Sequence, residues 1–539
     1  MVQLFAWPQP HIPDNDDGHR GRMTGIRAGG DLETPIGGDT IGGRLRRQTP
    51  LIVLLVVAAI VRVVATAQTA NSFLYPDELF QYLEQAHRHV FGYGVIPWEY
   101  RLGLRSWLYP LLLSVPMHLG GAIDPDGSLY LLLPRTLAAL SSLAIVWAAF
   151  ALGRRLSLAH AVIAAFVVAI WFEFVLYAAH SLTESLSFNA FMIGAVLTSD
   201  ARRTAPLLVG AGLAFGLAAI LRFQHIPAIA VFVLASRLPW RLWLPIIAGA
   251  AIAAGASAAV DLYTGQAPFG WLAANIGSNL LAGKADQFGT SPLLAYLGET
   301  MHRWGLWLLP ILLLAVRGAR LDRPLIWAAL ANLAFHMAIP HKEYRFIFLT
   351  ISIVVILAGL GTGEILIDLR KRWTTMRLPV VGAAAMSIWL VASVTRAMSP
   401  AVAADWKAYS PLPEALAETR RLGNLCGVTV YRSGFWTGAS YATLHREVPI
   451  YLVSPPEMKG IDADPPAGLR AMASAANVIL AQPGDRRDLD KSYRATSCHR
   501  PASGDFPTMC VFVRPGGCTA ADRQQRAHEV NAVLRRTGW

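Results

Sequence analysis

The chain has 539 residues, of which 54% are hydrophobic and only 15% are charged. Soluble proteins carry roughly a quarter charged residues, so this composition excludes an ordinary soluble protein. The net charge of +12 does not require a nucleic-acid partner, because the basic residues gather in short loops between apolar runs, where they orient membrane spans.

Residues 1–50 are rich in Gly, Pro and charge and contain no long apolar run. This composition predicts a disordered cytoplasmic tail rather than a cleavable signal peptide, with a misassigned start codon as the alternative. Arg44, Arg46 and Arg47 directly precede the first apolar run, which favours a cytoplasmic location for the tail.

Apolar runs of membrane-spanning length recur within residues 51–399, which predicts an all-α polytopic membrane domain. If every basic loop lies in the cytoplasm, the pattern gives eleven spans, with a cytoplasmic N-terminus and an external C-terminus. Residues 107–121 are apolar but short, so it stays open whether they cross, re-enter or lie in the interface; a crossing would raise the count to twelve. The predicted spans are 51–67, 129–152, 157–179, 185–199, 205–221, 224–236, 241–259, 303–316, 324–339, 345–366 and 379–395.

Residues 400–539 are expected to form a small external α/β domain. The runs GVTVYR, VPIYLV, ANVILA and MCVFVRP are typical of short strands, and DRQQRAHEVNAVLRR is typical of a terminal helix. All four cysteines lie here, which favours disulfides in an oxidising compartment, whereas their spacing is unlike that of a zinc site. Three pairings of Cys426, Cys498, Cys510 and Cys518 remain open.

Polar clusters fall on the external side of this topology, in the loops 69–128 and 260–302 and in HKEYRF at 341–346. In YPDELFQYLEQAHRH, Asp77, Gln81, Glu84 and Arg88 follow at helical spacing and are expected to share one face. Each cluster alone could serve a helix dipole or reach the lipid headgroups. Together they favour function, because ionisable groups at membrane depth are expensive, and acids beside cations suit a lipid phosphate substrate.

The stretch YPDELFQYLEQAHRHVFGYGVIPWEYRLGLRSWLYP resembles the first external loop of glycosyltransferase family 22. These enzymes are polyprenyl-phosphate-mannose-dependent α-mannosyltransferases of N-glycan precursors and GPI anchors. HKEYRF is similar to the HKE-x-RF motif of that family, and DLYTG followed by FGTSP is similar to its later loop. Tyr75 stands where the family often has His, and Pro97 where it has Thr, so a titrating imidazole at the first position is not expected.

The resemblance implies the GT-C fold and an inverting, metal-independent transfer of a hexose, mannose in this family, at the external face. The donor would be a polyprenyl-phosphate sugar, the acceptor a glycan or glycolipid, and no cofactor is expected. By position in the motif, Asp77 is the expected base, with Glu78 as the alternative base or an orienting partner. The expected ligands of the donor phosphate are Arg105, His341, Lys342 and Arg345. Residues expected to bind sugar or to orient the basic groups are Tyr75, Gln81, Glu84, Glu99 and Glu343.

The compact Arg-rich loops suggest a bacterial relative, located in the inner membrane with its site and C-terminal domain facing the periplasm. A transporter or flippase of lipid-linked sugars is the alternative, although transporters favour charges within spans and internal repeats. Arg62 and Arg135 do lie in or near spans, and we expect each to pair with an acid of a loop. A membrane-anchored binding protein is the third interpretation, and it leaves the motifs at the span edges unexplained.

Overall fold

The computed structural model describes residues 41–456, 458, 462–502 and 506–538. Most of the predicted disordered tail, residues 1–50, lies outside the described residues; residues 41–50 are helical and begin α1. Residues Thr49–Trp539 form one unit, which holds every element discussed below from residue 49 onward.

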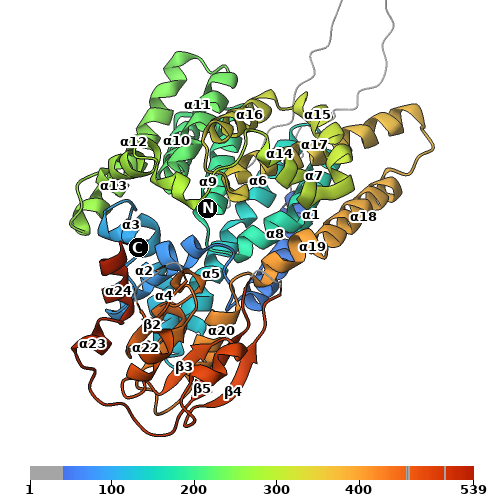
Figure 1. Ribbon diagram of the computed structural model, residues 1–539. Coiled ribbons are helices and arrows are strands. Elements are labelled where there is room, and N and C mark those ends of the chain that lie inside the picture. Colours follow the sequence, from blue (N-terminus) through green and yellow to red (C-terminus); the bar gives the residue numbers. More distant parts are fainter. Residues whose placement is uncertain (1–40, 457, 459–461, 503–505, 539) are drawn as a thin grey trace, which may run out of the picture. The chain divides into compact units, whose positions relative to one another are not determined.

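Helices dominate the first four hundred residues of the chain (Figure 1). The α-helices of this part are α1 (Ile41–Gln68), α2 (Glu84–Phe91), α3 (Trp98–Arg101), α4 (Leu108–Ile123), α5 (Leu129–Ser141), α6 (Leu143–Arg154), α7 (Leu158–Ile170), α8 (Phe172–Ala179), α9 (Thr183–Thr198), α10 (Ala205–Leu221), α11 (Ile226–Ala235), α12 (Trp243–Tyr263), α13 (Gly270–Asn275), α14 (Ala295–Trp304), α15 (Leu308–Ala319), α16 (Arg323–Ala338), α17 (Phe348–Arg372), α18 (Leu378–Ala397) and α19 (Pro400–Ala403). The π-helices are Glu78–Leu83 and Ile276–Leu281.

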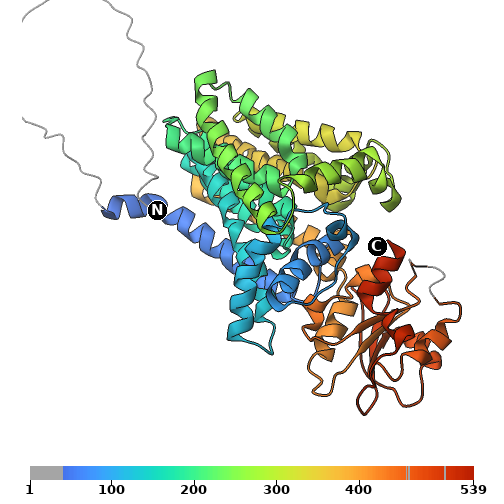
Figure 2. The same cartoon turned by 90° about the vertical axis from the view of Figure 1, so that its left-hand side faces the viewer.

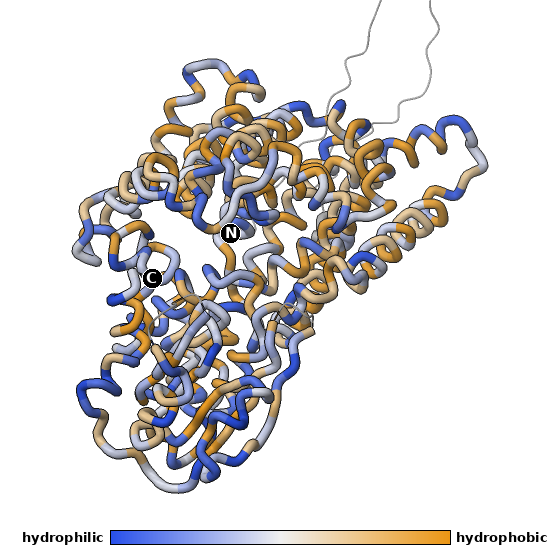
Figure 3. Tube along the Cα trace, in the orientation of Figure 1, coloured by the Kyte–Doolittle hydropathy of each residue, from blue (hydrophilic) through white to orange (hydrophobic). Residues whose placement is uncertain are grey.

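Five helices of the described part are long and apolar enough to cross a bilayer, or six if the bent pair α7 and α8 counts as one span. The eleven predicted spans are therefore not confirmed. Three apolar helices, Leu108–Ile123, Ala205–Leu221 and Phe223–Ala235, have only 10–17 residues. A helix of 17 residues is about 26 Å long, slightly less than the apolar core of a typical bilayer. Figure 3 shows that hydrophobic residues nevertheless dominate α10, α12, α15 and α18.

Helix α17 is the most buried of the long apolar helices, with 89% of its apolar window inside the protein. It packs closely against α15 because both helices have glycine at the contact. A Cβ atom at Gly361 would overlap the carbonyl oxygen of Leu314, and one at Gly318 would overlap that of Leu357. Small residues at such contacts let membrane helices approach until their backbones touch. Helix α17 thus forms a fixed support that begins directly after HKEYRF.

A break between α7 and α8 bends this apolar segment by 51° at Trp171. The carbonyl groups freed by the break are bonded within the protein. The buried Arg62 of α1 donates to Val168 O at 3.2 Å and to Ala169 O at 3.0 Å, and Ser393 Oγ donates to Ile170 O at 2.7 Å. The expected pairing of Arg62 with a loop acid is therefore wrong. Its guanidinium instead bonds backbone carbonyl groups, which must find donors in an apolar environment.

The C-terminal part contains a five-stranded mixed sheet in the order β2-β1-β3-β5-β4. β1 pairs in parallel with β2 and β3, whereas β5 runs antiparallel to β3 and β4. The strands are β1 (Val428–Tyr431), β2 (Ile450–Val453), β3 (Val478–Ala481), β4 (Arg494–His499) and β5 (Met509–Val513). The helices are α20 (Pro411–Thr419), α21 (Tyr441–Leu444), α22 (Pro465–Ala471), α23 (Arg523–Arg526) and α24 (Val530–Thr537).

Four of these strands coincide with the predicted β-type runs. β4 was not predicted, because RATSCH is largely exposed and polar and so lacks an apolar pattern. The predicted terminal helix is divided into α23 and α24, since Glu529 leaves the helical path to form an isolated bridge with Tyr451 of β2. The disulfides are Cys426–Cys518 and Cys498–Cys510, and the second joins directly paired residues of β4 and β5.

The segment 69–128 and the C-terminal part are joined by hydrogen bonds in the protein interior. The Glu84 carboxylate accepts backbone N–H groups of Val95 at 2.6 Å, Tyr441 at 3.1 Å and Ala442 at 2.7 Å. Asn531 of α24 bonds the backbone N–H of Ile96 at 2.8 Å. Figure 2 shows α24, in red, beside the blue helices of the segment 69–128. One hydrophobic core runs through both regions, so this contact is part of the folded interior.

A buried histidine pair lies in the same contact. His87 Nε2 lies 3.0 Å from His445 Nδ1, and the His445 ring stacks on Tyr130 with centroids 3.7 Å apart. Burial, and then the neighbouring His445, lower the pKa of His87 to about 3. Burial, and then Arg420, lower the pKa of His445 to about 4, whereas Asp126 acts weakly in the opposite direction. Both rings are therefore neutral at neutral pH.

We expect this contact to weaken in acid. With both pKa values below the ordinary histidine value of about 6.5, the unfolded chain binds more protons than the folded one between pH ~6.5 and ~4, so stability falls as the pH drops through that window. The unfolding temperature of the detergent-solubilised protein, measured at pH 7 and pH 5, checks this. His445 has a φ of +47°, which Asn tolerates, so His445→Asn is a matched control that should flatten the pH dependence. An equally steep loss in His445→Asn would contradict the assignment.

Candidate active site

Asp77 opens a π-helical turn, Glu78–Leu83, that leads directly into α2. A π-turn is wider than an α-turn, and such turns often occur at functional sites. It rotates later side chains away from the face that regular helical spacing predicts. Gln81 thus donates to Glu99 Oε1 at 3.0 Å, whereas Glu84 binds the backbone of the C-terminal part. The shared face expected for these side chains is wrong, because one wide turn places them in different surroundings.

The structure brings Asp77 and HKEYRF together. Arg345 Nη2 donates to Asp77 Oδ2 at 2.7 Å. The same guanidinium donates through Nε to Glu343 Oε2 at 2.7 Å and lies 3.4 Å from Glu184 Oε1. Tyr75 stacks beneath it, with the ring centroid 4.4 Å from Cζ of Arg345. The Asp77 side chain keeps 22% exposure, and within the described residues only its Oδ2 oxygen is bonded.

Two residues of this cluster were not predicted, namely Glu184 and Arg222. Arg222 Nη2 pairs with Glu184 Oε1 at 2.9 Å, so alternating charges run from Arg222 through Glu184 and Arg345 to Asp77. Each lies one residue beyond the predicted external end of a span, 185–199 or 205–221. Their position at the span ends could have indicated that these two residues belong to the site. A single charge at a span end, however, usually only reaches toward the lipid headgroups.

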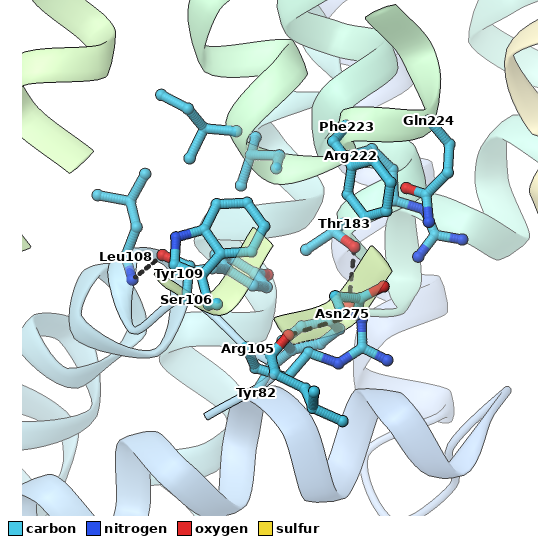
Figure 4. A pocket seen from close by; sticks show the side chains of 14 residues that line it. Tyr82, Arg105, Ser106, Leu108, Tyr109, Thr183, Arg222, Phe223, Gln224 and Asn275 are labelled. Atoms are coloured by element: carbon cyan, nitrogen blue, oxygen red, sulfur yellow. Dashed lines mark hydrogen bonds between the residues drawn. The ribbon is translucent and has the colours of Figure 1, made fainter. Parts of the chain in front are cut away.

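A pocket lies beside the cluster and is lined by Arg105 and Arg222 (Figure 4). Tyr82 and Thr183 also line it, joined by a hydrogen bond of 2.8 Å, and Asn275 enters from the loop 260–302. The buried Arg105 Nε has no hydrogen-bond partner among the described residues. A buried N–H donor without a partner is costly, so this side of the pocket is suited to an anion.

Asp77 and Arg105 influence each other electrostatically. Burial alone would lower the pKa of Arg105, but attraction to Asp77 first, and also to Tyr82 and Glu99, raises it above its ordinary value. Burial raises the pKa of Glu99, and the charge of Asp77 adds to that effect while Arg105 opposes it. The pocket thus contains a cation that the surrounding charges hold firmly ionised, and the partly exposed Asp77 is one of those charges.

Glu78 differs from its neighbour Asp77 in being fully buried. Its carboxylate accepts the backbone N–H groups of Ser181 at 2.9 Å and Leu74 at 3.1 Å, and it bonds His180 Nδ1 at 2.7 Å. Arg135 lies 3.6 Å away, so the expected pairing of Arg135 with an acid of a loop is confirmed. Burial alone would raise the pKa of Glu78, but His180 and Arg135 hold it below its ordinary value. A substrate hydroxyl therefore reaches Asp77 more readily than Glu78.

His341 and Lys342 are turned toward the loop 260–302 rather than lining the pocket. His341 Nδ1 bonds Gly289 O at 2.8 Å, and its Nε2 bonds Glu343 Oε1 at 3.1 Å. Lys342 Nζ donates to Ser291 O at 3.2 Å and to Ile339 O at 2.6 Å. The hydrogen bond with Glu343 raises the pKa of His341. Burial alone would raise the pKa of Glu343, but Arg345 and His341 outweigh it and lower that pKa to about 2. These contacts fasten the loop to HKEYRF.

The fold has a solved counterpart in ArnT from Cupriavidus metallidurans bound to undecaprenyl phosphate. The TM-score is 0.53 and the identity 12%, over 88% of this chain and 100% of that chain. At this identity the likeness shows the fold alone, and it supports the expected GT-C fold, a helical membrane architecture with a small C-terminal sheet. With its membrane-type helices, the chain is an integral membrane protein.

Sequence comparison identifies mannosyltransferases. GPI mannosyltransferase 3 of Yarrowia lipolytica is 31% identical over 345 residues, which are 61% of this chain and 65% of that protein. The protein of the same name from Drosophila melanogaster is 38% identical over 92 residues, 17% of this chain and 16% of that protein. The chain thus aligns with less than two thirds of the length of either relative. The profile of the Alg9-like mannosyltransferase family matches residues 52–437, well over half of the sequence. The chain therefore belongs to the Alg9-like mannosyltransferase family.

Proposed function

We propose that the protein is an inverting mannosyltransferase that moves mannose from a polyprenyl-phosphate-linked donor to a glycan or glycolipid acceptor. The observation that carries this proposal is a partly exposed acid, Asp77, near a pocket where Arg105 Nε has no hydrogen-bond partner among the described residues. The family membership supports the sugar. The fold shared with a protein bound to undecaprenyl phosphate supports a lipid phosphate donor.

The reaction follows from this arrangement. Asp77 accepts the proton of the acceptor hydroxyl, and the resulting oxygen nucleophile attacks the anomeric carbon opposite the phosphate. The new C–O bond forms as the bond to the phosphate oxygen breaks, so the configuration inverts and the electron pair leaves with the lipid phosphate. Arg105 and Arg222 neutralise the charge that develops on that leaving group. No step requires a metal or a cofactor.

The remaining predicted site residues receive positioning roles. Arg345 orients the Asp77 carboxylate, with Tyr75 stacked beneath the guanidinium and Glu343 fixing its other edge. Glu78 holds the backbone that leads into the π-turn. His341 and Lys342 hold the external loop, which delivers Asn275 to the pocket. Gln81 and Glu99 remain candidates for contact with sugar hydroxyls.

The site is proposed to face the periplasm from the inner membrane of a bacterium. Helix α17 has 25 residues, so its far end lies about 37 Å from Arg345. Three basic residues, Arg370, Lys371 and Arg372, occupy that far end, and the positive-inside rule locates them in the cytoplasm. Two disulfides in the C-terminal part fit an oxidising compartment on the other side.

A transporter or flippase is the second candidate, and the break between α7 and α8 favours it, since transporters bind cargo at broken helices. Here Arg62 and Ser393 occupy the freed carbonyl groups, so the break offers none of these acceptors to a cargo. Transfer of radiolabelled mannose from polyprenyl-phosphate mannose to membrane acceptors separates the two functions. We expect a labelled glycan product; movement of the donor across vesicles without product would support the transporter.

Arg105→Ala tests the donor site. We expect the KM for polyprenyl-phosphate mannose to rise about 10- to 100-fold, the usual value of a hydrogen bond to a charged group. Arg105→Lys should recover part of the loss, because Lys keeps the charge without the planar fork. Arg241→Ala, in the short helical turn Trp240–Leu242 that leads into α12, is the matched control and should leave the donor KM unchanged. An unchanged donor KM in Arg105→Ala would exclude Arg105 from phosphate binding.

A further inference from the structure

Three aromatic side chains that the proposed reaction does not use gather near the charged cluster that contains Asp77 and Arg345. Tyr409 lies in the linker after α19, Trp436 in the short helical turn Phe435–Thr437, and Phe506 in the approach to β5. The Tyr409 ring centroid lies 4.5 Å from that of Phe506 and 5.9 Å from that of Trp436. These residues form the aromatic cluster.

The aromatic cluster adjoins the segment that carries Asp77. Phe435, directly before Trp436, packs on Phe80 of the π-turn with ring centroids 5.4 Å apart. On the linker side, the backbone N–H of Phe73 donates to Ala408 O at 3.1 Å, directly before Tyr409. The pKa of Tyr409 rises to about 12, chiefly through burial and then through the charge of Glu343, which agrees with a position close to the carboxylates.

The aromatic cluster is also held open toward solvent. Trp436 is 37% exposed although its neighbours Phe435 and Thr437 are buried. Tyr409 has a φ of +50°, a left-handed conformation that is strained for a bulky residue and that recurs at ligand sites. The position of the Tyr409 ring between Trp436 and Phe506 thus depends on an energetically costly backbone conformation.

A shallow hollow adjoins Tyr409 and Phe506 and mixes apolar walls with hydroxyl groups. Tyr409, Phe506 and Met509 supply apolar surface, and Ser433 and Thr437 supply hydroxyls 3.2 Å apart. This combination matches a pyranose, which has an apolar face of C–H groups and an edge of hydroxyl groups. A lipid chain would instead follow the apolar spans, whereas most of this lining belongs to the C-terminal part.

We propose that the aromatic cluster binds the acceptor, stacking the exposed Trp436 on a hexose ring of the glycan, with Tyr409 at the edge of that ring, so that its hydroxyl meets Asp77. The proposal rests on the proposed function, because it assigns the acceptor side of the same site. Arg105 and Arg222 would then hold the donor phosphate, while the acceptor enters from the C-terminal part.

Octyl α-mannobioside is a suitable probe, and its binding to the detergent-solubilised protein is measured by calorimetry without turnover. We expect Trp436→Ala to weaken binding at least tenfold and Trp436→Phe to stay within threefold of wild type. Tyr409→Asn should weaken binding similarly, because Asn tolerates the left-handed backbone. Trp373→Ala, which removes another exposed indole, should have no effect. Equal binding in Trp436→Ala and wild type, or no binding by the wild type, overturns the proposal.

Transfer kinetics with the same probe distinguish failure of the proposed acceptor site from failure of the proposed mannosyltransferase function. If the aromatic cluster binds the acceptor, Trp436→Ala raises the KM for the mannobioside at least tenfold and leaves the KM for the lipid donor unchanged. A rise in the donor KM equal to the rise in the acceptor KM would indicate a general structural effect and would overturn the proposal. If Trp436-dependent binding persists but the wild type transfers no mannose, the proposed function fails and the sugar site stands.

Discussion

Asp77→Asn is expected to lower mannosyl transfer by about 10²-fold or more, with a properly inserted and folded protein. Asparagine keeps the size of the side chain and accepts the hydrogen bond from Arg345, but it cannot take up the proton of the acceptor hydroxyl. A loss of this size is the usual result of removing a general base. Single-turnover transfer of radiolabelled mannose in membranes measures it, because binding and chemistry are then separated.

The matched control for Asp77→Asn is Asp368→Asn. Asp368 also pairs with an arginine, Arg317, but near the far end of α17, where both side chains are substantially exposed. This substitution makes the same chemical change to an ion pair and should leave transfer within twofold of wild type. Near-normal transfer by Asp77→Asn would assign the base to another group and would remove the central step of the mechanism.

Arg345→Ala is expected to destabilise the protein by about 3–5 kcal/mol, the typical effect of removing one partner from a buried ionic cluster. Arg345 is 5% exposed, and its loss leaves Asp77 and Glu343 without their cation. The unfolding temperature of the solubilised protein and the yield of folded protein measure the effect. Arg317→Ala, which breaks the exposed pair with Asp368, should cost less than about 1 kcal/mol.

A double variant separates the folding role of Arg345 from its role in the reaction. Adding Glu343→Gln removes one of the two carboxylates that Arg345→Ala leaves without a cation. The double variant Arg345→Ala/Glu343→Gln should therefore regain part of the lost stability. Transfer should stay low, because Asp77 still lacks the group that orients it. Recovery of transfer together with stability would show that Arg345 acts on folding alone.

Sequence patterns predicted the parts of the fold that depend on composition. Apolar runs and basic loops identified a membrane protein, and alternating β-type runs identified four strands. Asp77 and Arg345 were assigned to one site from the resemblance, and the structure brings them into contact across 268 residues. The number of spans was not predictable in the same way, because α10 and α11 are as apolar as the spanning helices and differ mainly in length.

The unpredicted parts of the candidate site depend on single residues and long-range contacts. One wide turn at Glu78–Leu83 changes which side chains share a face, and hydrophobic periodicity does not reveal such a local change. Glu184 and Arg222 resemble ordinary charges at span ends until the fold pairs them. The partners of Glu84 and Lys342 are backbone groups, and backbone partners leave no mark on the sequence.

The hydrogen bond from Ile96 to Asn531 joins residues 435 positions apart. At about 5–20 residues per second, a ribosome needs about 20–90 s to make the intervening chain. The segment that bears Asp77 is therefore synthesised early and lacks this contact until Asn531 has been made. A chain interrupted before Asn531 cannot form the hydrogen bond that holds Ile96 to α24.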